Sequence, residues 1–172
     1  MQKLNRLRQI CRQNTAFLIT FPLVITADQL TKLWVKSSLA VSESVCDTGF
    51  FRISHIHNTG SSFGLFKNQF LALSIISVTG AFVVLFLVFF MRRRLPFLNN
   101  GWVLFALGLI LGGNIGNLID RLSYHYVIDF IDFSFWPAFN VADSSLVVGA
   151  ILLAFLIIRY DRQSRQPDAR DN

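Results

Sequence analysis

The sequence predicts an all-α integral membrane protein with four transmembrane helices, and three observations lead to this fold class. Hydrophobic residues make up 53% of its 172 residues and charged residues only 15%, whereas soluble domains carry about 25% charged residues. Four apolar stretches reach or approach the roughly 20 residues needed to cross a bilayer. Most Lys and Arg residues lie beside the ends of these stretches. A soluble domain and a disordered chain are both excluded, because so small a core cannot bury this much apolar surface.

The four spans are expected at residues 15–35, 70–91, 101–120 and 138–158. The first becomes long enough only by including Asp28 and Lys32, and the fourth only by starting upstream of Asp143. The first span also follows a basic segment, as in a signal peptide, but an A-x-A cleavage pattern is missing, so we expect a retained helix. Residues 1–172 are therefore expected to form a single membrane-embedded domain.

The basic residues also predict the orientation of the chain. They cluster before the first span, between the second and third spans, and after the fourth span. By the positive-inside rule, both termini are cytoplasmic, and the outer loops 37–68 and 122–137 face the other side. This pattern accounts for the net charge of +6, so no nucleic-acid partner is expected. Residues 50–58 roughly alternate between apolar and polar side chains, which predicts a short strand in the first outer loop.

Several sequence features that often mark active or metal sites lack the partner residues or the fold that such sites need. Cys11 and Cys46 fall on opposite membrane faces, so they cannot form a disulfide. His55 and His57 are spaced like a pair of metal ligands, but no third ligand is evident, and neither a metal nor a cofactor is expected. The residues around Ser62 match G-x-S-x-G, but that motif needs an α/β sheet that this chain does not predict.

Four charged residues map to the outer ends of their spans: Asp28, Lys32, Asp120 and Asp143. A charge inside a membrane helix is costly, so each is a candidate for a functional role. Asp28 and Lys32 are spaced i, i+4 on one helical face, which favours a supporting ion pair.

Asp120 and Asp143 are the candidate catalytic residues. The third and fourth spans run antiparallel, so the two carboxylates should reach the same level, each with an asparagine, Asn117 or Asn140, three residues before it. Two nearby carboxylates at low dielectric share a proton, and such a dyad activates water in aspartic proteases. The alternatives are structural: Asp120 pairs with Arg121, and Asp143 caps its helix.

Two further patterns favour structural roles. Gly108, Gly112 and Gly116 recur every four residues in the third span, which lets a neighbouring helix pack closely. Asp129 and Asp132 flank apolar residues of the second outer loop, and we expect them to bind loop backbone.

The sequence resembles the bacterial lipoprotein signal peptidase family, the type II signal peptidases, in blocks that keep the family's order and spacing. The blocks are DQLTK (28–32), NTGSSF (58–63), GGNIGNLIDR (112–121), VIDFIDF (127–133) and FNVADS (139–144). The resemblance implies a four-helix bundle with a small extracytoplasmic β-sheet. It also implies an aspartic endopeptidase that removes signal peptides from prolipoproteins just before a diacylglyceryl-modified cysteine.

The resemblance assigns roles to individual residues. The catalytic dyad would be Asp120 and Asp143. The residues that would bind substrate or support the dyad are Asn58, Gly60, Asn117, Arg121, Asn140, Ala142, Asp28 and Lys32. Ser61 and Ser62 stand where the family usually has alanines, which affects the loop and not the dyad.

The resemblance also implies where the protein acts and with what. Its partners would be diacylglyceryl-modified prolipoproteins and membrane lipids, with no obligate protein partner. Its location would be the bacterial cytoplasmic (inner) membrane, as a multi-pass protein with the active site toward the extracytoplasmic face.

Two other classes fit the charge pattern in part. A small proton-coupled transporter would use intramembrane aspartates, but transporters usually place them near the midplane of repeated, broken helices. A noncatalytic scaffold would explain the glycines but not two Asn-x-x-Asp faces at one level. A scaffold should tolerate Asp120→Asn, which separates it from the peptidase.

Overall fold

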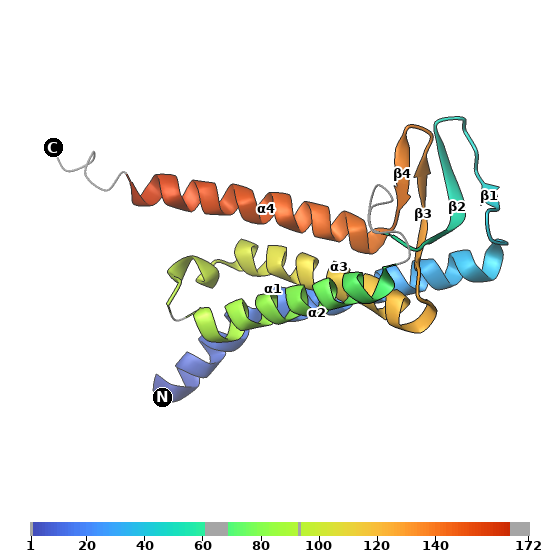
Figure 1. The fold of residues 1–172 in the computed structure, drawn as a ribbon. Helices are drawn as coiled ribbons and strands as arrows, with labels where there is room; N and C mark the ends of the chain where they lie inside the picture. The colour runs from blue at the N-terminus through green and yellow to red at the C-terminus, as the bar shows by residue number, and fades with distance from the viewer. Residues whose placement is uncertain (1, 61–68, 93, 166–172) are drawn as a thin grey trace.

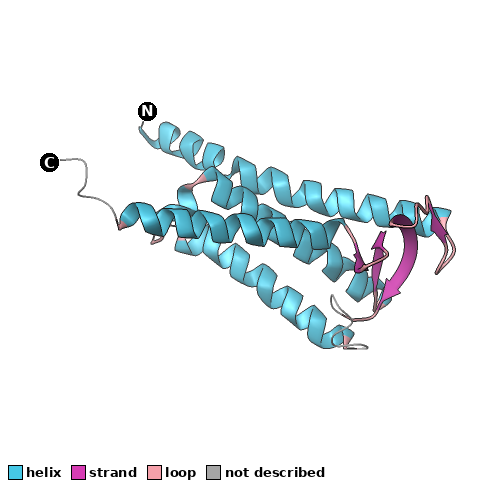
Figure 2. Ribbon diagram, turned by 90° about the horizontal axis from the view of Figure 1, so that it is seen from above, coloured by secondary structure: helices cyan, strands magenta, loops and turns pink. Residues whose placement is uncertain are grey.

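The computed structural model describes residues 2–60, 69–92 and 94–165. Its long helices lie side by side in an elongated bundle, and a small sheet covers one end (Figures 1 and 2). The helices are α1 (Gln2–Ser38), α2 (Phe70–Phe86), α3 (Gly101–Tyr124) and α4 (Val141–Ser164). A π-helical turn, η2 (Leu87–Met91), continues α2, and a 3-10 turn, η3 (Pro96–Asn99), precedes α3. Each of the four regions is long and apolar enough to cross a membrane, which confirms the predicted fold class.

Helix α3 is the centre of the bundle. In its most apolar window 56% of the residues are buried, compared with 28% in α1, 28% in α2 and 11% in α4. The glycine stripe makes this possible on the α1 side. A Cβ on Gly108 would lie 2.9 Å from Thr20 Cβ, and one on Gly112 would lie 2.6 Å from Val24 Cβ. The prediction that these small residues admit a neighbouring helix is therefore confirmed, and the neighbour is α1.

The sheet is antiparallel, with strand order β1-β2-β3-β4. Its strands are β1 (Ser44–Val45), β2 (Phe51–Asn58), β3 (Val127–Phe133) and β4 (Trp136–Phe139). Strand β2 confirms the strand predicted at residues 50–58. An apolar cluster fastens the sheet to the end of α1, with Val35 and Leu39 packed against Ile128 and Phe130. Strand β3 follows the end of α3, and strand β4 leads into the start of α4, so both helices connect directly to the sheet.

The fourth span begins later than the sequence predicted. Residues 136–139 pair with β3 instead of continuing the helix upstream, and Asn140 caps α4, which starts at Val141. The fourth helix reaches full length at its other end, at Ser164. As a result, Asp143 lies in the first turn of α4, next to the sheet.

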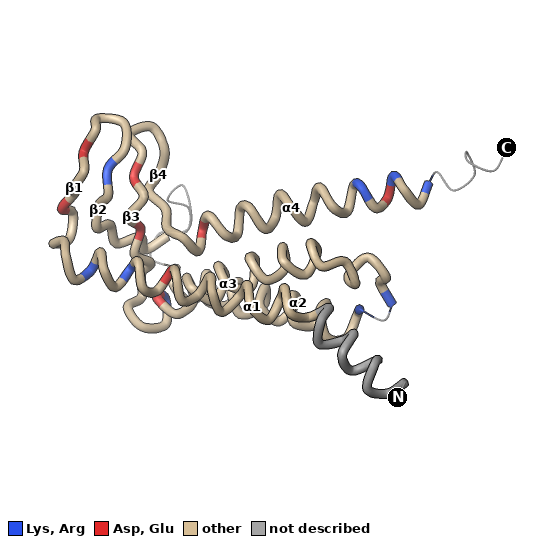
Figure 3. The backbone as a smooth tube through the Cα atoms, turned by 180° about the vertical axis from the view of Figure 1, so that it is seen from behind, with Lys and Arg blue, Asp and Glu red and all other residues tan. Residues whose placement is uncertain are grey.

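The acidic residues of the described chain lie mostly at one end of the bundle (Figure 3). They gather at the sheet end, apart from Asp161 near the end of α4. Basic residues lie at both ends: Lys32, Lys36, Arg52 and Arg121 lie at the sheet end, whereas the other described Arg residues follow α2 or lie in the last turns of α4 at the opposite end. The start of α1 and the end of α4 also lie at this opposite end (Figure 1). The candidate carboxylates Asp28, Asp120 and Asp143 lie toward the sheet end, where α1, α3 and α4 approach the sheet.

Candidate active site

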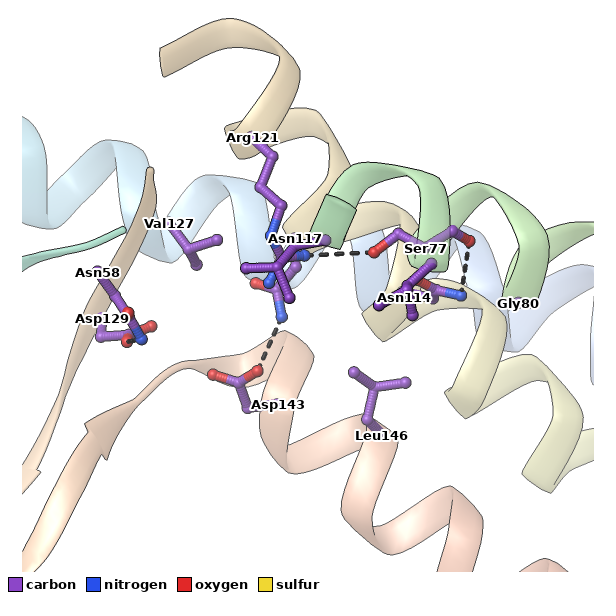
Figure 4. Close-up of a pocket in the computed structure, with 12 residues that line it drawn as sticks. Asn58, Ser77, Gly80, Asn114, Asn117, Arg121, Val127, Asp129, Asp143 and Leu146 are labelled. Atoms are coloured by element: carbon purple, nitrogen blue, oxygen red, sulfur yellow. Dashed lines mark hydrogen bonds between the residues drawn. The ribbon is translucent and has the colours of Figure 1, made fainter. Parts of the chain in front are cut away.

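A cavity of about 350 Å³ opens where α2, α3 and α4 meet the sheet (Figure 4). Its walls combine apolar and polar side chains, with Leu73, Ile76 and Leu146 on the helix side. The lining residues are Asn58, Leu73, Ile76, Ser77, Gly80, Asn114, Asn117, Arg121, Val127, Asp129, Asp143 and Leu146. Two carboxylates, Asp129 and Asp143, therefore face the same pocket.

Asp143 is held by both of its oxygens at the start of α4. Its Oδ2 accepts a hydrogen bond from the backbone N–H of Asn140 at 3.3 Å, while Asn140 Oδ1 accepts from the backbone N–H of Asp143 at 2.9 Å. These two bonds form a capping box, so the structural alternative of helix capping is real. The other carboxylate oxygen, Oδ1, accepts from Asn117 Nδ2 at 2.8 Å and lies in the pocket. Asp143 thus caps α4 and faces the pocket at once.

Asp129 lies on β3, opposite Asp143. Its Oδ1 accepts from Asn140 Nδ2 at 2.7 Å and its Oδ2 accepts from Asn58 Nδ2 at 2.8 Å. Burial and, to a lesser extent, the nearby charge of Asp143 raise the pKa of Asp129 to about 7, although these two hydrogen bonds and the charge of Lys32 act to lower it. Asn140 contacts both aspartates, because it donates to Asp129 and caps the helix turn that carries Asp143. The two carboxylates therefore form one electrostatically coupled pair.

Asp120, the expected partner of Asp143, does not line this pocket. Its Oδ2 lies 3.0 Å from Lys32 Nζ and accepts from the backbone N–H of Ile128 at 3.1 Å. Its Oδ1 accepts from Gln29 Nε2 at 3.0 Å. The helical face of Asp120 turns toward α1, so the structure brings it to Lys32 and not to Asp143. The ion-pair partner of Asp120 is Lys32 and not Arg121, so the structural alternative of an Asp120–Arg121 pair is not found either.

Asp28 and Lys32 form the predicted i, i+4 ion pair, at 2.8 Å and fully buried. Asp28 Oδ1 also accepts from the backbone N–H of Ala142 at 2.9 Å, which fastens α1 to the start of α4. Lys32 Nζ donates to Asn117 Oδ1 at 3.0 Å. A chain of contacts therefore runs from Asp143 through Asn117 to Lys32 and its two carboxylates.

The remaining predicted residues lie around the pocket rim. Gly60 donates its backbone N–H to Asn58 Oδ1 at 2.9 Å, which orients the amide that contacts Asp129. Arg121 lines the pocket and donates from Nη1 to Ser77 Oγ at 3.3 Å. Ser61 and Ser62 lie outside the described residues. Arg121 therefore lines the pocket, and Gly60 bonds to Asn58, which also lines it.

Asp129, Asn114 and Ser77 line the pocket although the sequence did not predict them as site residues. Asp129 was expected to bind loop backbone, but its segment forms β3, and its carboxylate contacts two asparagine side chains. Asp132, three residues further along β3, forms an ion pair with Arg52 of β2, with 2.6 Å between Arg52 Nε and Asp132 Oδ2. An acidic residue inside the apolar run 127–133 was the available signal for a buried carboxylate.

His55 and His57 belong to the sheet and His125 caps the end of α3, so none of these three described histidines lines the pocket. His55 is buried and its Nδ1 lies 2.9 Å from the carbonyl oxygen of Leu39, while His57 stacks on Tyr126. Across residues 2–60, 69–92 and 94–165, no three His, Cys, Asp or Glu side chains are arranged to hold a metal ion.

The fold and the pocket together indicate the class of protein to which the chain belongs. A bundle of four membrane-spanning helices with paired carboxylates in a partly apolar pocket has the architecture of a polytopic membrane enzyme. Comparison with solved structures agrees. One bacterial membrane enzyme superposes with a TM-score of 0.77 at 25% identity over 91% of this chain and 94% of that one. A second superposes with a TM-score of 0.70 at 27% identity over 82% and 91%.

Sequence comparison then gives the family. Residues 20–159 match the family described as Signal peptidase (SPase) II. The lipoprotein signal peptidase of Dehalococcoides mccartyi is 44% identical over 142 residues, which cover 83% of this chain and 88% of the relative. That of Moorella thermoacetica is 37% identical over 153 residues, which cover 88% and 99%. The chain belongs to the signal peptidase II family, and it is a multi-pass membrane peptidase that removes signal peptides from lipoproteins.

Proposed function

We propose that this peptidase is an aspartic endopeptidase whose catalytic dyad is Asp129 and Asp143, and that it cuts just before a diacylglyceryl-modified cysteine. The observation that carries the proposal is that these two carboxylates line one pocket and are joined through Asn140. In place of the Asp120–Asp143 dyad expected from the sequence, the geometry favours Asp129 as the partner.

Asp120 is better suited to a structural role. Both of its oxygens already accept hydrogen bonds, from Lys32, Gln29 and the backbone of Ile128. Binding a water molecule or a substrate there would break contacts that are buried and charged, which is costly. Its bond to the Ile128 N–H instead fixes the strand that carries Asp129, so Asp120 acts as a positioning residue.

The dyad supplies both halves of acid–base catalysis. With a pKa of about 7, Asp129 holds a proton in about half of the molecules at neutral pH, and Asp143 serves as the ionised partner. Asp143 takes a proton from a water molecule, whose oxygen attacks the scissile carbonyl carbon, while Asp129 donates its proton to the carbonyl oxygen. In the collapse of the resulting gem-diol intermediate, one hydroxyl returns a proton to Asp129, the C–N bond breaks, and the proton held by Asp143 passes to the leaving amine.

Asn117 lies between the dyad and the Lys32 ion pair, and its hydrogen bonds fix which of its atoms faces Asp143. Asn117 Oδ1 accepts from Lys32 at 3.0 Å and from Asn140 at 3.1 Å, so its NH₂ group must face Asp143. Lys32 therefore acts on the dyad through Asn117, without touching the reacting atoms. This arrangement keeps a hydrogen-bond donor aimed at the catalytic base while the positive charge stays one residue away.

The pocket lies where a membrane-anchored substrate presents its cleavage site. The pocket lies at the sheet end of the bundle, and the apolar residues Leu73, Ile76 and Leu146 line its helix side. A diacylglyceryl chain gains about 0.8 kcal/mol per buried methylene, which anchors the cysteine at this depth. The Arg-rich end of the bundle supports an orientation with both termini cytoplasmic and the pocket toward the extracytoplasmic face of the bacterial inner membrane.

A cleavage assay with matched substrates tests this function. Purified protein in detergent is given one prolipoprotein with a diacylglyceryl-modified cysteine and the same precursor without the lipid. We expect rapid cleavage of the lipidated form only, with mass spectrometry locating the new N-terminus at the modified cysteine. Equal rates for the two precursors, or a cut elsewhere, would contradict the proposed specificity.

A further inference from the structure

Asn114 is a polar pocket residue to which the dyad mechanism gives no role. It lies on α3 three residues before Asn117, so it lines the same pocket about 4.5 Å deeper along the helix. Figure 4 shows it beside Ser77 of α2, on the helix side of the pocket. Its surroundings there include apolar Leu73, Ile76 and Leu146. An amide at this depth needs hydrogen-bond partners, because lipid-exposed hydrocarbon offers none.

The orientation of the Asn114 amide follows from its partner. Its Nδ2 donates to the backbone carbonyl oxygen of Ser77 at 3.0 Å. A carbonyl oxygen only accepts, so the NH₂ group must face α2 and the Oδ1 atom must face away from Ser77. In the part of the chain that the structure describes, no donor bonds to this Oδ1. The pocket wall therefore presents a hydrogen-bond acceptor with a fixed direction.

Two neighbours hold this amide in place. Ser77 is itself fastened to α3, because Arg121 donates to its Oγ at 3.3 Å. Gly80 leaves the room that the amide occupies, since a Cβ there would lie 2.6 Å from Asn114 Nδ2. A pre-oriented polar group loses little side-chain entropy when a ligand binds, so it contributes more to affinity than a mobile one.

We propose that Asn114 is a substrate-binding residue whose Oδ1 accepts a backbone N–H from the signal-peptide segment just upstream of the cut. The inference rests on the proposed function, because it takes the dyad as the position of the scissile bond. It adds a role for a residue outside the dyad and its supporting network.

The chemistry of the substrate explains why the upstream segment is the partner. A diacylglyceryl thioether carries ester and ether acceptors but no donor, so it cannot bond to an acceptor oxygen. The signal peptide does carry donors, and its residues nearest the cut must leave the helix to expose the scissile bond to the dyad. Their N–H groups then lose their helical partners at membrane depth, where an unpaired N–H is costly. Asn114 Oδ1 offers one of them a partner.

Backbone substitution in the substrate tests the proposal directly. A lipidated peptide substrate is prepared with each upstream amide replaced in turn by an ester, which removes one N–H and keeps the chain length. We expect the unmodified enzyme to lose about fivefold in kcat/KM at one upstream position, the size of a single hydrogen bond. In Asn114→Leu, which keeps the volume and removes the acceptor, that position-specific loss should vanish. Equal ester penalties at every position in both enzymes would overturn the proposal.

Matched variants separate substrate binding from folding. Gly80→Ala keeps Asn114 but displaces its amide, so it should reduce the same position-specific loss. Ser74→Ala is the control, because Ser74 is a buried α2 hydroxyl that bonds its own helix and does not line the pocket. It should leave the ester profile unchanged, and an altered profile there would contradict a specific role for Asn114. If Asp143→Asn cleaves the all-amide substrate at the normal rate, the proposed function itself fails. If cleavage does depend on Asp143 but Asn114→Leu shows the same ester penalties as the unmodified enzyme, only this inference is overturned.

Discussion

Lys32 Nζ lies 2.8 Å from Asp28 Oδ2 and 3.0 Å from Asp120 Oδ2, so one buried ammonium group joins α1 to α3. Contact with Lys32 divides the aspartates near the sheet end into two groups. Asp28 and Asp120 share one buried cation, which suits a structural role, whereas Asp129 and Asp143 face the pocket with amide partners. Carboxylates held only by amides retain the capacity to take up and release protons.

The buried cation should be important for stability. Lys32→Met removes the charge and leaves two buried carboxylates without their counter-ion, so we expect a loss of about 3–5 kcal/mol in unfolding free energy. Thermal unfolding in detergent measures the effect. Lys36→Met is the control on the same helix, because Lys36 is exposed and lies over the Tyr124 ring. Comparable unfolding midpoints for the two variants would show that the buried ion pair does not support the fold.

The coupled dyad predicts the pH dependence of cleavage. Burial and the charge of Asp143 raise the pKa of Asp129 to about 7, and the mechanism needs Asp129 protonated. As the pH rises through 7, Asp129 loses this proton, so kcat should fall about tenfold per pH unit on the alkaline side. The measurement is a pH–rate profile on lipidated substrate, with thermal unfolding at each pH to verify that the protein stays folded. A rate that stays flat from about pH 6 to pH 9 would rule out Asp129 as the proton donor.

Close packing of α3 against α4 should set the position of Asp143. A Cβ on Gly113 would clash with the backbone carbonyl oxygen of Ala142, one residue before Asp143. Gly113→Ala should therefore push the start of α4 away, cost about 1–3 kcal/mol of stability and reduce kcat. Gly101→Ala is the matched control, since a Cβ there meets nothing within 4 Å. Similar activity and stability in both variants would indicate that this helix contact does not position the dyad.

The proposed orientation is open to a labelling test. Cys46 is exposed between β1 and β2, at the sheet end of the bundle, whereas Cys11 lies in the N-terminal part of α1. With the sheet outside the cell, a membrane-impermeant thiol reagent added to intact cells should modify Cys46. A Cys46→Ser variant should lose this labelling, and permeabilisation should add the signal of Cys11. Labelling of Cys11 in intact cells would reverse the topology.

The sequence predicted the bundle well because its physical signals are local. Apolar length and basic flanks are enough to locate four spans, and i, i+4 spacing is enough to pair Asp28 with Lys32. The choice of dyad partner depended on rotation of α3 about its axis. Asp120 and Asn117 share a broad helical face, but contact with α1 turns Asp120 to Lys32 and leaves Asn117 at the pocket. Sequence spacing gives the level of a residue in the membrane, but it does not give the neighbour that a helical face meets.

The start of α4 and the role of β3 escaped prediction for a related reason. Hydropathy extended the fourth span upstream, but residues 136–139 found hydrogen-bond partners on β3, and Asn140 then capped the helix. Pairing with β2 likewise turned the segment around Asp129 into a strand. Such pairing joins residues far apart in the chain, so it leaves no local signal that a single sequence reveals.

The choice between Asp129 and Asp120 as the partner of Asp143 is the central claim, and parallel activity measurements on two variants test it most directly. Asp129→Asn and Asp120→Asn are purified in detergent, verified as folded by thermal unfolding, and given lipidated prolipoprotein under single-turnover conditions. We predict that Asp129→Asn folds like the unmodified protein and loses cleavage by at least about 100-fold, as Asp143→Asn should. Asp120→Asn should be less stable but should retain cleavage per folded molecule. Near-normal turnover by folded Asp129→Asn, together with complete loss in folded Asp120→Asn, would contradict the account.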